Sequence, residues 1–221
     1  NIGEGHFILH SMLESSPVSP SNQYPEKNHP PAPNRYQDLR SFRVPEGFRG
    51  RPEWYVQLWW LVQWFLFRPS PQVLYGWRRF LLRAFGAHIG QHVLIRPTAM
   101  VTYPWKLSIG DYSWIGDDVV LYSLGEIKVG AHTVISQRSY LCTGTHDHTA
   151  PGFDIQAHPV HIGDQVWVAT DVYVAPGVEI GTGSVIGARS SVYTSLPGGM
   201  ICYGSPAKPV KPRPTSEKES I

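Results

Sequence analysis

Between Ile89 and Val192 an aliphatic residue recurs at every sixth position, in five groups of three. The fifteen positions are Ile89, Ile95 and Val101; Ile109, Ile115 and Leu121; Val129, Ile135 and Leu141; Ile162, Val168 and Val174; and Ile180, Ile186 and Val192. Glycine often follows them, and the fifth residue of a hexad is usually small or β-branched. A period of six matches neither a helix nor an ordinary strand.

This period predicts a mainly β solenoid in which each hexad contributes one short strand and one corner. Three hexads close a triangular coil, with the aliphatic residues in its interior and the small fifth residues in its narrow corners. We expect the glycines to permit backbone conformations that a side chain would strain. The pattern therefore predicts about five coils within residues 88–205.

Two apolar segments precede the repeat and predict a short helical region over residues 35–87. One helix is expected over residues 52–67, which begin with Pro52 and Glu53. A second is expected from Ser70 as its N-cap to a stop at Gly86. Its basic residues, Arg78, Arg79 and Arg83, are interpreted as a solvated face.

The first helix is rich in tryptophan, but its 14 residues from Trp54 to Phe67 would extend only about 21 Å, too short for a hydrocarbon core of about 30 Å. Two interpretations stay open. The helix packs against the main domain or a neighbouring subunit, or it makes peripheral contact with a membrane through its tryptophans and flanking arginines.

Composition excludes some classes of protein. The 19 basic and 17 acidic residues give a net charge of +2, which does not indicate a nucleic-acid partner. The two cysteines, Cys142 and Cys202, cannot form a disulfide-dense scaffold and favour a reducing, cytoplasmic compartment. Proline-rich residues 1–34 are interpreted as a disordered tail or a stretch foreign to the natural protein, and residues 206–221 as a C-terminal tail.

The repeat is interrupted at three places, and chemistry is expected where residues leave a scaffold. The steps from Val101 to Ile109 and from Leu121 to Val129 are two residues too long. The step from Leu141 to Ile162 is 21 residues, which predicts a functional loop over 142–160. That loop carries His146, His148, His158, Asp147 and Asp154.

The loop segment Thr143-Gly144-Thr145-His146-Asp147 resembles the segment that carries the catalytic histidine of the hexapeptide-repeat acetyltransferases. Four further segments are similar to the colanic-acid-type branch, which is associated with acetylation of extracellular polysaccharide: QDLRSFRVPEGFRGRP, YGWRRFLLRAFGAHIG, TYPWKLSIGDYSWIGDDVVLYSLGEI and GSPAKPVKPR. The resemblance covers residues 37–214. It implies a left-handed parallel β-helix, a carbohydrate acceptor, acetyl-CoA as co-substrate without a metal, and a homotrimer whose sites are completed by neighbouring subunits.

The resemblance also implies roles for individual residues. His146 would be the general base that deprotonates an acceptor hydroxyl for direct attack on the thioester, a role that suits a group with a pKa near 6.5. Asp147 is a candidate to orient it. The candidates for acceptor contacts are Tyr122, Glu126, Arg138, Asp147 and His148. The oxyanion is expected to meet a backbone N–H that the sequence does not identify.

For acetyl-CoA, the resemblance places the pantetheine arm along the later coils. Trp167, Thr170 and Ala188 hold matching positions, although Trp167 is equally consistent with an ordinary exposed aromatic residue. Lys208, Lys211 and Arg213 follow the last coil and are candidates for the CoA phosphates. As residues of a proline-rich tail, they are equally consistent with solvated charges.

Other functions remain as alternatives. A small-sugar acetyltransferase differs only in its acceptor. A γ-type carbonic anhydrase holds zinc with three histidines, two of them spaced HxxxxH, and no such pair occurs here. A non-catalytic scaffold would have no need of the long loop. A covalent intermediate on Cys142 is disfavoured, because Cys142 directly follows the inward Leu141 and the family transfers acetyl groups without one.

Overall fold

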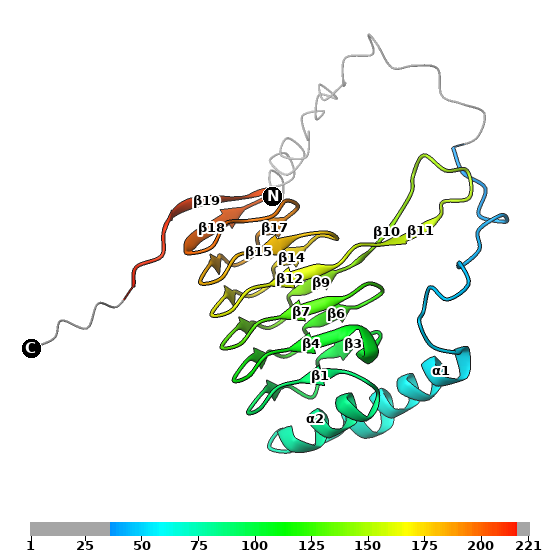
Figure 1. Cartoon of the computed structure of the whole chain (residues 1–221), viewed down its shortest axis with the longest axis horizontal. Helices are drawn as coiled ribbons and strands as arrows, with labels where there is room; N and C mark the ends of the chain where they lie inside the picture. Colours follow the sequence, from blue (N-terminus) through cyan, green and yellow to red (C-terminus); the bar gives the residue numbers. More distant parts are fainter. Residues whose placement is uncertain (1–35, 216–221) are drawn as a thin grey trace, which may run out of the picture. The chain divides into compact units, whose positions relative to one another are not determined.

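The computed structural model describes residues 36–215. The chain divides into units 1–36 and 37–221, and every described helix and strand lies in the second unit. The segment 1–34 and the last six residues, both predicted as tails, lie outside the described residues. Figure 1 shows the second unit as a stack of coils with helices α1 and α2 beyond one end of the stack.

Three parallel sheets form the faces of the solenoid. The first sheet contains β1 (His88–Ile89), β4 (Leu107–Ile109), β7 (Ile127–Val129), β12 (Val160–Ile162) and β15 (Glu179–Ile180). The second contains β2 (Leu94–Ile95), β5 (Trp114–Ile115), β8 (Val134–Ile135), β13 (Trp167–Val168), β16 (Val185–Ile186) and β18 (Met200–Gly204), with β19 (Ala207–Pro212) antiparallel at its edge. The third contains β3 (Met100–Val101), β6 (Val120–Tyr122), β9 (Tyr140–Cys142), β14 (Tyr173–Val174) and β17 (Ser191–Val192). The predicted parallel β-helix is confirmed.

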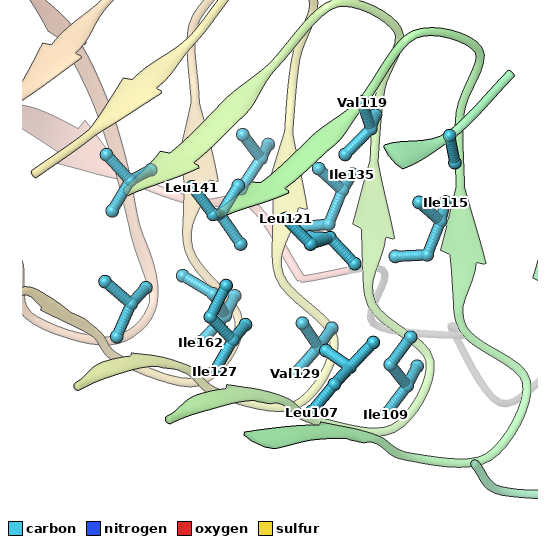
Figure 2. Close-up of a cluster of buried hydrophobic side chains, with 14 of the residues drawn as sticks. Leu107, Ile109, Ile115, Val119, Leu121, Ile127, Val129, Ile135, Leu141 and Ile162 are labelled. Atoms are coloured by element: carbon cyan, nitrogen blue, oxygen red, sulfur yellow. The ribbon is translucent and has the colours of Figure 1, made fainter. Parts of the chain in front are cut away.

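The core follows the hexad pattern. All fifteen predicted inward residues are buried, with at most 6% of their surface exposed, and Figure 2 shows several of them converging inside the coils. Small hydroxyl residues at the corners are buried as well. Ser113 donates to Gly130 O at 2.6 Å, and Thr133 donates to Gly163 O at 2.7 Å. These side chains therefore join one coil to the next as well as filling the corner.

The glycines that follow inward residues serve a different purpose from the one expected. Positive φ angles occur two residues later, at side chains such as His92 (54°) and Tyr112 (57°). A Cβ on Gly110 would lie 2.5 Å from the backbone nitrogen of Ala131 in the next coil. Glycine is required at such positions because the neighbouring coil approaches too closely, and not because of its conformational freedom.

The coils extend further than predicted. Leu196 and Cys202 are six residues apart and both are buried, so they continue the hexad spacing after an irregular step. Leu196 bridges to Ile180, and β18 pairs with β16, which adds a sixth, incomplete coil to the expected five. Part of the predicted C-terminal tail is also ordered, because β19 pairs antiparallel with β18.

The first predicted helix is observed as α1 (Glu53–Val62), which continues as the single π-helical turn η1 (Gln63–Phe67). The second helix, α2 (Tyr75–Ala84), has Leu74 as its N-cap and so begins four residues later than expected. Ser70 does not cap it, because the Ser70 hydroxyl donates to Phe67 O and accepts a hydrogen bond from the Arg78 guanidinium. A short 3-10 helix, η2 (Pro104–Lys106), follows β3.

The predicted solvated face of α2 is wrong for Arg78, whereas Arg79 is half-buried and Arg83 is exposed as expected. Arg78 is fully buried, and all three arginines donate to backbone carbonyls of the first coil. Within the stack, the carbonyls of inward residues accept hydrogen bonds from the preceding coil, and the first coil has no preceding coil. Its carbonyls therefore need other donors.

Each face of the first coil receives one donor from the helices. Arg83 binds Ile89 O on the first sheet at 2.6 Å. Arg78 binds Ile95 O on the second sheet at 2.6 Å, and the Trp59 indole binds Val101 O on the third sheet at 2.8 Å. The helices thus cap the open end of the hydrogen-bond ladder.

We predict that Arg78→Ala lowers the free energy of unfolding by about 3–5 kcal/mol, because it empties a fully buried site and removes the donor of the buried Ile95 carbonyl and of three partly buried acceptors. Burial lowers the pKa of the Arg78 guanidinium, but an arginine remains charged at neutral pH. Arg79→Ala is the matched control. It removes one hydrogen bond, to Val93 O, from a partly exposed side chain, and should cost about 1 kcal/mol. Equal losses in denaturant unfolding of the two variants would contradict the capping role.

Candidate active site

All three interruptions of the repeat leave the solenoid at the same corner, between the third and first sheets. The first contains η2 and the second contains residues 123–126. The third contains the hairpin of β10 (Gly144–His146) and β11 (Ile155–Ala157), which projects from the stack in Figure 1. Because the coils stack in register, the two short insertions lie on successive coils leading to the hairpin.

Thr143 anchors the base of the hairpin. Its side chain is fully buried, donates to Tyr122 O at 2.6 Å and accepts from Gly125 N at 2.8 Å. Its carbonyl accepts from His158 N at 2.8 Å, which closes the mouth of the loop. The next residue must be glycine, because a Cβ on Gly144 would lie 2.8 Å from the Tyr122 ring.

A second hydrophobic cluster supports the hairpin from the side. Its buried members are Val56 of α1, Tyr103 and Leu124, and Ile155 and Ala157 of β11 pack against it. The cluster therefore connects the first helix, the two short insertions and the hairpin. Burial of these residues fixes where the strand opposite His146 can lie.

Lys106 of η2 ties the segment before α1 to the same insertions. Its ammonium donates to Phe48 O at 2.7 Å and to Leu124 O, and lies 5.4 Å from the centre of the Phe48 ring. Burial lowers the pKa of this amine. The neighbouring Trp105 indole donates to Arg49 O at 2.7 Å.

His146 ends β10, directly opposite Ile155 of β11. Its Nδ1 lies 2.8 Å from Phe153 O, and its ring stacks on the Phe153 ring with centroids 4.2 Å apart. The Phe42 ring approaches at 5.9 Å. A carbonyl oxygen only accepts, so in the neutral imidazole Nδ1 carries the proton and the Nε2 lone pair is available. Nε2 has no hydrogen-bond partner among residues 36–215. This arrangement suits a general base.

Asp147 does not orient His146. Its carboxylate accepts from Thr149 N at 2.8 Å and from the Thr149 hydroxyl at 2.6 Å, and these bonds lower the pKa of Asp147. It therefore stabilises the turn of the hairpin. Phe153 supplies the orienting carbonyl instead, from a backbone with a positive φ of 53°. Such a conformation is strained for an aromatic residue, and Tyr112 adopts it too, at an ordinary corner of the solenoid.

The other residues predicted to contact the acceptor lie at different places in the structure. Tyr122 lies against the base of the hairpin, and His148 is exposed in the segment between β10 and β11. Glu126 forms an ion pair with Lys128 at 2.9 Å and a hydrogen bond with His161 Nε2 at 3.4 Å, and both contacts lower the pKa of Glu126. Arg138 lies at another corner, between the second and third sheets, where it pairs with Asp171 at 2.7 Å and lowers the pKa of that carboxyl to about 2.

The predicted CoA contacts lie on the second sheet and at both of its corners, with Arg213 at the corner between the first and second sheets. Trp167 is half exposed and donates to the Ser136 hydroxyl, and Thr170 and Ala188 lie on successive coils at that corner. Lys208 and Lys211 are exposed on β19, whereas Arg213 donates to Gln165 O and Gly183 O. A single chain does not bring Trp167, Thr170 and Ala188 together with His146, because the third sheet lies between their corner and the corner of the hairpin.

The third sheet carries a row of tyrosines that the sequence analysis missed. Tyr122, Tyr140, Tyr173 and Tyr193 have successive ring centroids 5.9, 6.1 and 5.9 Å apart. Burial raises the pKa of Tyr140 and of Tyr173 to about 12. A signal was present, since Tyr140 and Tyr173 both directly precede an inward aliphatic residue.

A groove of about 820 Å³ on the first sheet was also missed. Its lining includes His88, Ser108, Lys128, His161 and Glu179, which share one register position on successive strands. Within the part of the chain that the structure describes, no three His, Cys, Asp or Glu side chains gather as metal ligands.

Comparisons with known proteins agree with this architecture. The family described as "Bacterial transferase hexapeptide (six repeats)" matches residues 159–193. WcaF of Escherichia coli (strain K12), an inferred colanic acid biosynthesis acetyltransferase, is 61% identical over 82% of this chain and 100% of its own length.

Two solved structures show the same fold. A maltose O-acetyltransferase from Clostridium difficile 630 has a TM-score of 0.67 at 22% identity, covering 77% of this chain and 90% of its own. A hexapeptide-repeat acetyltransferase from Vibrio cholerae, complexed with acetyl-CoA, has a TM-score of 0.65 at 24% identity, covering 77% and 89%. The repeat, the histidine hairpin and the extended identity to WcaF together establish that this chain belongs to the hexapeptide-repeat acetyltransferases.

Proposed function

We propose that this acetyltransferase moves the acetyl group of acetyl-CoA directly to a carbohydrate hydroxyl, with His146 as the general base. The observation that carries the proposal is the His146 imidazole, which Phe153 O holds in the tautomer that leaves Nε2 unprotonated. The acetyl-CoA complex of the Vibrio cholerae relative supports the choice of donor.

In the proposed reaction, Nε2 of His146 accepts the proton of the acceptor hydroxyl as its oxygen bonds to the thioester carbonyl carbon. The C–S bond then breaks, and the imidazolium returns the proton to the departing thiolate of CoA. Phe153 O keeps its hydrogen bond to Nδ1–H throughout and favours the transient imidazolium. Atoms and charges balance without an acyl-enzyme and without a metal.

The acceptor that we propose is a precursor of an extracellular polysaccharide. Its support is the 61% identity to WcaF, which is named for colanic acid biosynthesis and is matched over its whole length. A small sugar is the second candidate, since the Clostridium difficile neighbour is named for maltose, but that likeness is at 22% identity. We place the reaction in the cytoplasm, which both cysteines support by being free thiols.

A homotrimer with threefold symmetry is part of the proposal. His146 and the candidate CoA contacts lie at different corners of one solenoid. A neighbouring subunit that presented Trp167, Thr170 and Ala188 to the His146 hairpin would complete the site. The cations proposed to meet the CoA phosphates are Lys208 and Lys211 on β19 and Arg213 just after it.

His146→Ala should lower kcat by about 10² to 10⁴ and leave the Kd for acetyl-CoA nearly unchanged, because the base acts on the acceptor and not on the donor. His158→Ala is the matched control, since His158 is an exposed histidine of the same loop, and its kcat should stay within about threefold of wild type. Steady-state kinetics and calorimetry check both values. Full activity of His146→Ala would remove this residue from the mechanism.

Cys142→Ala should retain kcat within about threefold, and intact-mass spectra of the wild-type protein during turnover should show no stable acetyl group. The reason is that Cys142 is buried and its thiol donates to Gly144 O. An acetylated Cys142 peptide that forms and decays at the turnover rate would contradict direct transfer.

A further inference from the structure

The two N-terminal helices lie beyond the first coil of the solenoid (Figure 1), and their exposed side chains form a large apolar surface. We call it the helical end face. Its exposed residues are Trp54, Leu58, Trp60, Leu61, Trp64, Phe65 and Leu66 of α1 and η1, together with Val73, Leu74, Trp77 and Phe80 at and before α2. Phe65 is 72% exposed, Phe80 58% and Trp64 57%, which are high values for aromatic residues.

These exposed residues lie on the outward side of the two helices. The opposite side of the helices packs against the first coil. Val56, Trp59, Gln63 and Phe67 are buried, at the spacing of one helix face. The two helices also form one surface, because the Trp77 indole of α2 donates to Leu66 O of η1 at 2.9 Å and stacks on Phe80. The helical end face is therefore additional to the core contacts of these helices.

The charge around this surface has one sign. From Trp54 to Gly110 the chain contains six basic residues and no acidic residue. Three of the six contribute no free charge to this surface, because Arg78 is buried, Arg96 pairs with Asp117 and Lys106 donates to backbone carbonyls. Arg68 lies over the Trp64 ring at 4.4 Å, and Arg51 lies over the Tyr55 ring at 5.6 Å. The nearest acidic residue in sequence, Glu53, is paired with Arg49 at 2.7 Å.

We propose that the helical end face binds the interface of a lipid bilayer that contains anionic lipids. Tryptophan side chains favour the headgroup boundary, and arginines beside them reach anionic headgroups while their stems cover apolar surface. Helices α1 and η1 together extend about 22 Å, so they lie along the interface. Within residues 36–215, no helix combines the length and hydropathy needed to cross a bilayer.

A second copy of the chain is a poorer occupant of this surface. Two helical end faces in contact would bring their arginines together without acidic partners, whereas an anionic headgroup layer complements them. The proposal does not depend on acetyl transfer. It does place the candidate active site close to the bilayer, because Val56 of α1 packs in the cluster that supports the His146 hairpin.

Co-sedimentation of the full chain with vesicles tests the proposal. Wild-type protein should pellet with vesicles of equal parts phosphatidylcholine and phosphatidylglycerol, and less with phosphatidylcholine alone or at high salt. The triple variant Trp64→Gln, Phe65→Gln, Phe80→Gln should bind the anionic vesicles at least about tenfold more weakly, because it removes three apolar anchors. Trp114→Gln is the matched control, since Trp114 is 53% exposed on the second sheet, and it should bind within about twofold of wild type.

Thermal unfolding by circular dichroism should show that the triple variant folds, because all three residues are exposed. If it does not fold, Phe65→Gln alone replaces it, with an expected loss of about threefold or more. Wild-type protein that remains in the supernatant with anionic vesicles would overturn the proposal, as would a variant that pellets like wild type. Light scattering gives one further outcome. If the wild type does not bind vesicles and the triple variant has a lower molar mass than the wild type, the surface is occupied by a second copy of the chain. That result would also overturn the proposal.

Discussion

The backbone hydrogen bonds between successive coils are the constraint on which the rest of the structure depends. Gly90 N donates to Ile109 O, Gly110 N to Val129 O and Gly130 N to Ile162 O, each at 2.8 Å. Every coil must return to the same three faces to keep these bonds, so extra residues leave only at corners. All three insertions leave at one corner, and the hairpin that carries His146 therefore rests on two shorter insertions and on α1.

A ladder of this kind has two open ends, and each is covered differently. Arg78, Arg83 and Trp59 occupy the outward carbonyls of the first coil, one on each sheet. At the other end β19 folds back along β18. These contacts protect the first coil, and at the other end the edge of the second sheet, from pairing with other chains. The cap on the first coil also fixes the orientation of α1 and α2. In this orientation α1 supports the hairpin through Val56, and the outward side of both helices forms the helical end face.

The fold was predictable because one physical rule repeats fifteen times, and every predicted inward residue is buried. Features that occur only once in the chain were harder to predict. Leu196 follows Val192 after a step of four, so the last, incomplete coil escaped the pattern. In the sequence, Arg78 belongs to a group of arginines that is typical of a solvent-exposed helix face. Its burial is explained by the Ile95 carbonyl of the first coil, which has no donor from a preceding coil and accepts from Arg78. His146 was identified from its motif, but Phe153 gave no signal because its role depends on backbone geometry within an aperiodic loop.

The central claim is that the β10–β11 hairpin, which the two short insertions support, forms part of an acetyl-transfer site that works without a metal. Calorimetric titration of the full chain with acetyl-CoA, repeated after treatment with a strong zinc chelator, tests it most directly. The account predicts saturable binding at about one acetyl-CoA per subunit, unchanged by the chelator. Absence of binding, or binding that disappears when zinc is removed, would contradict it.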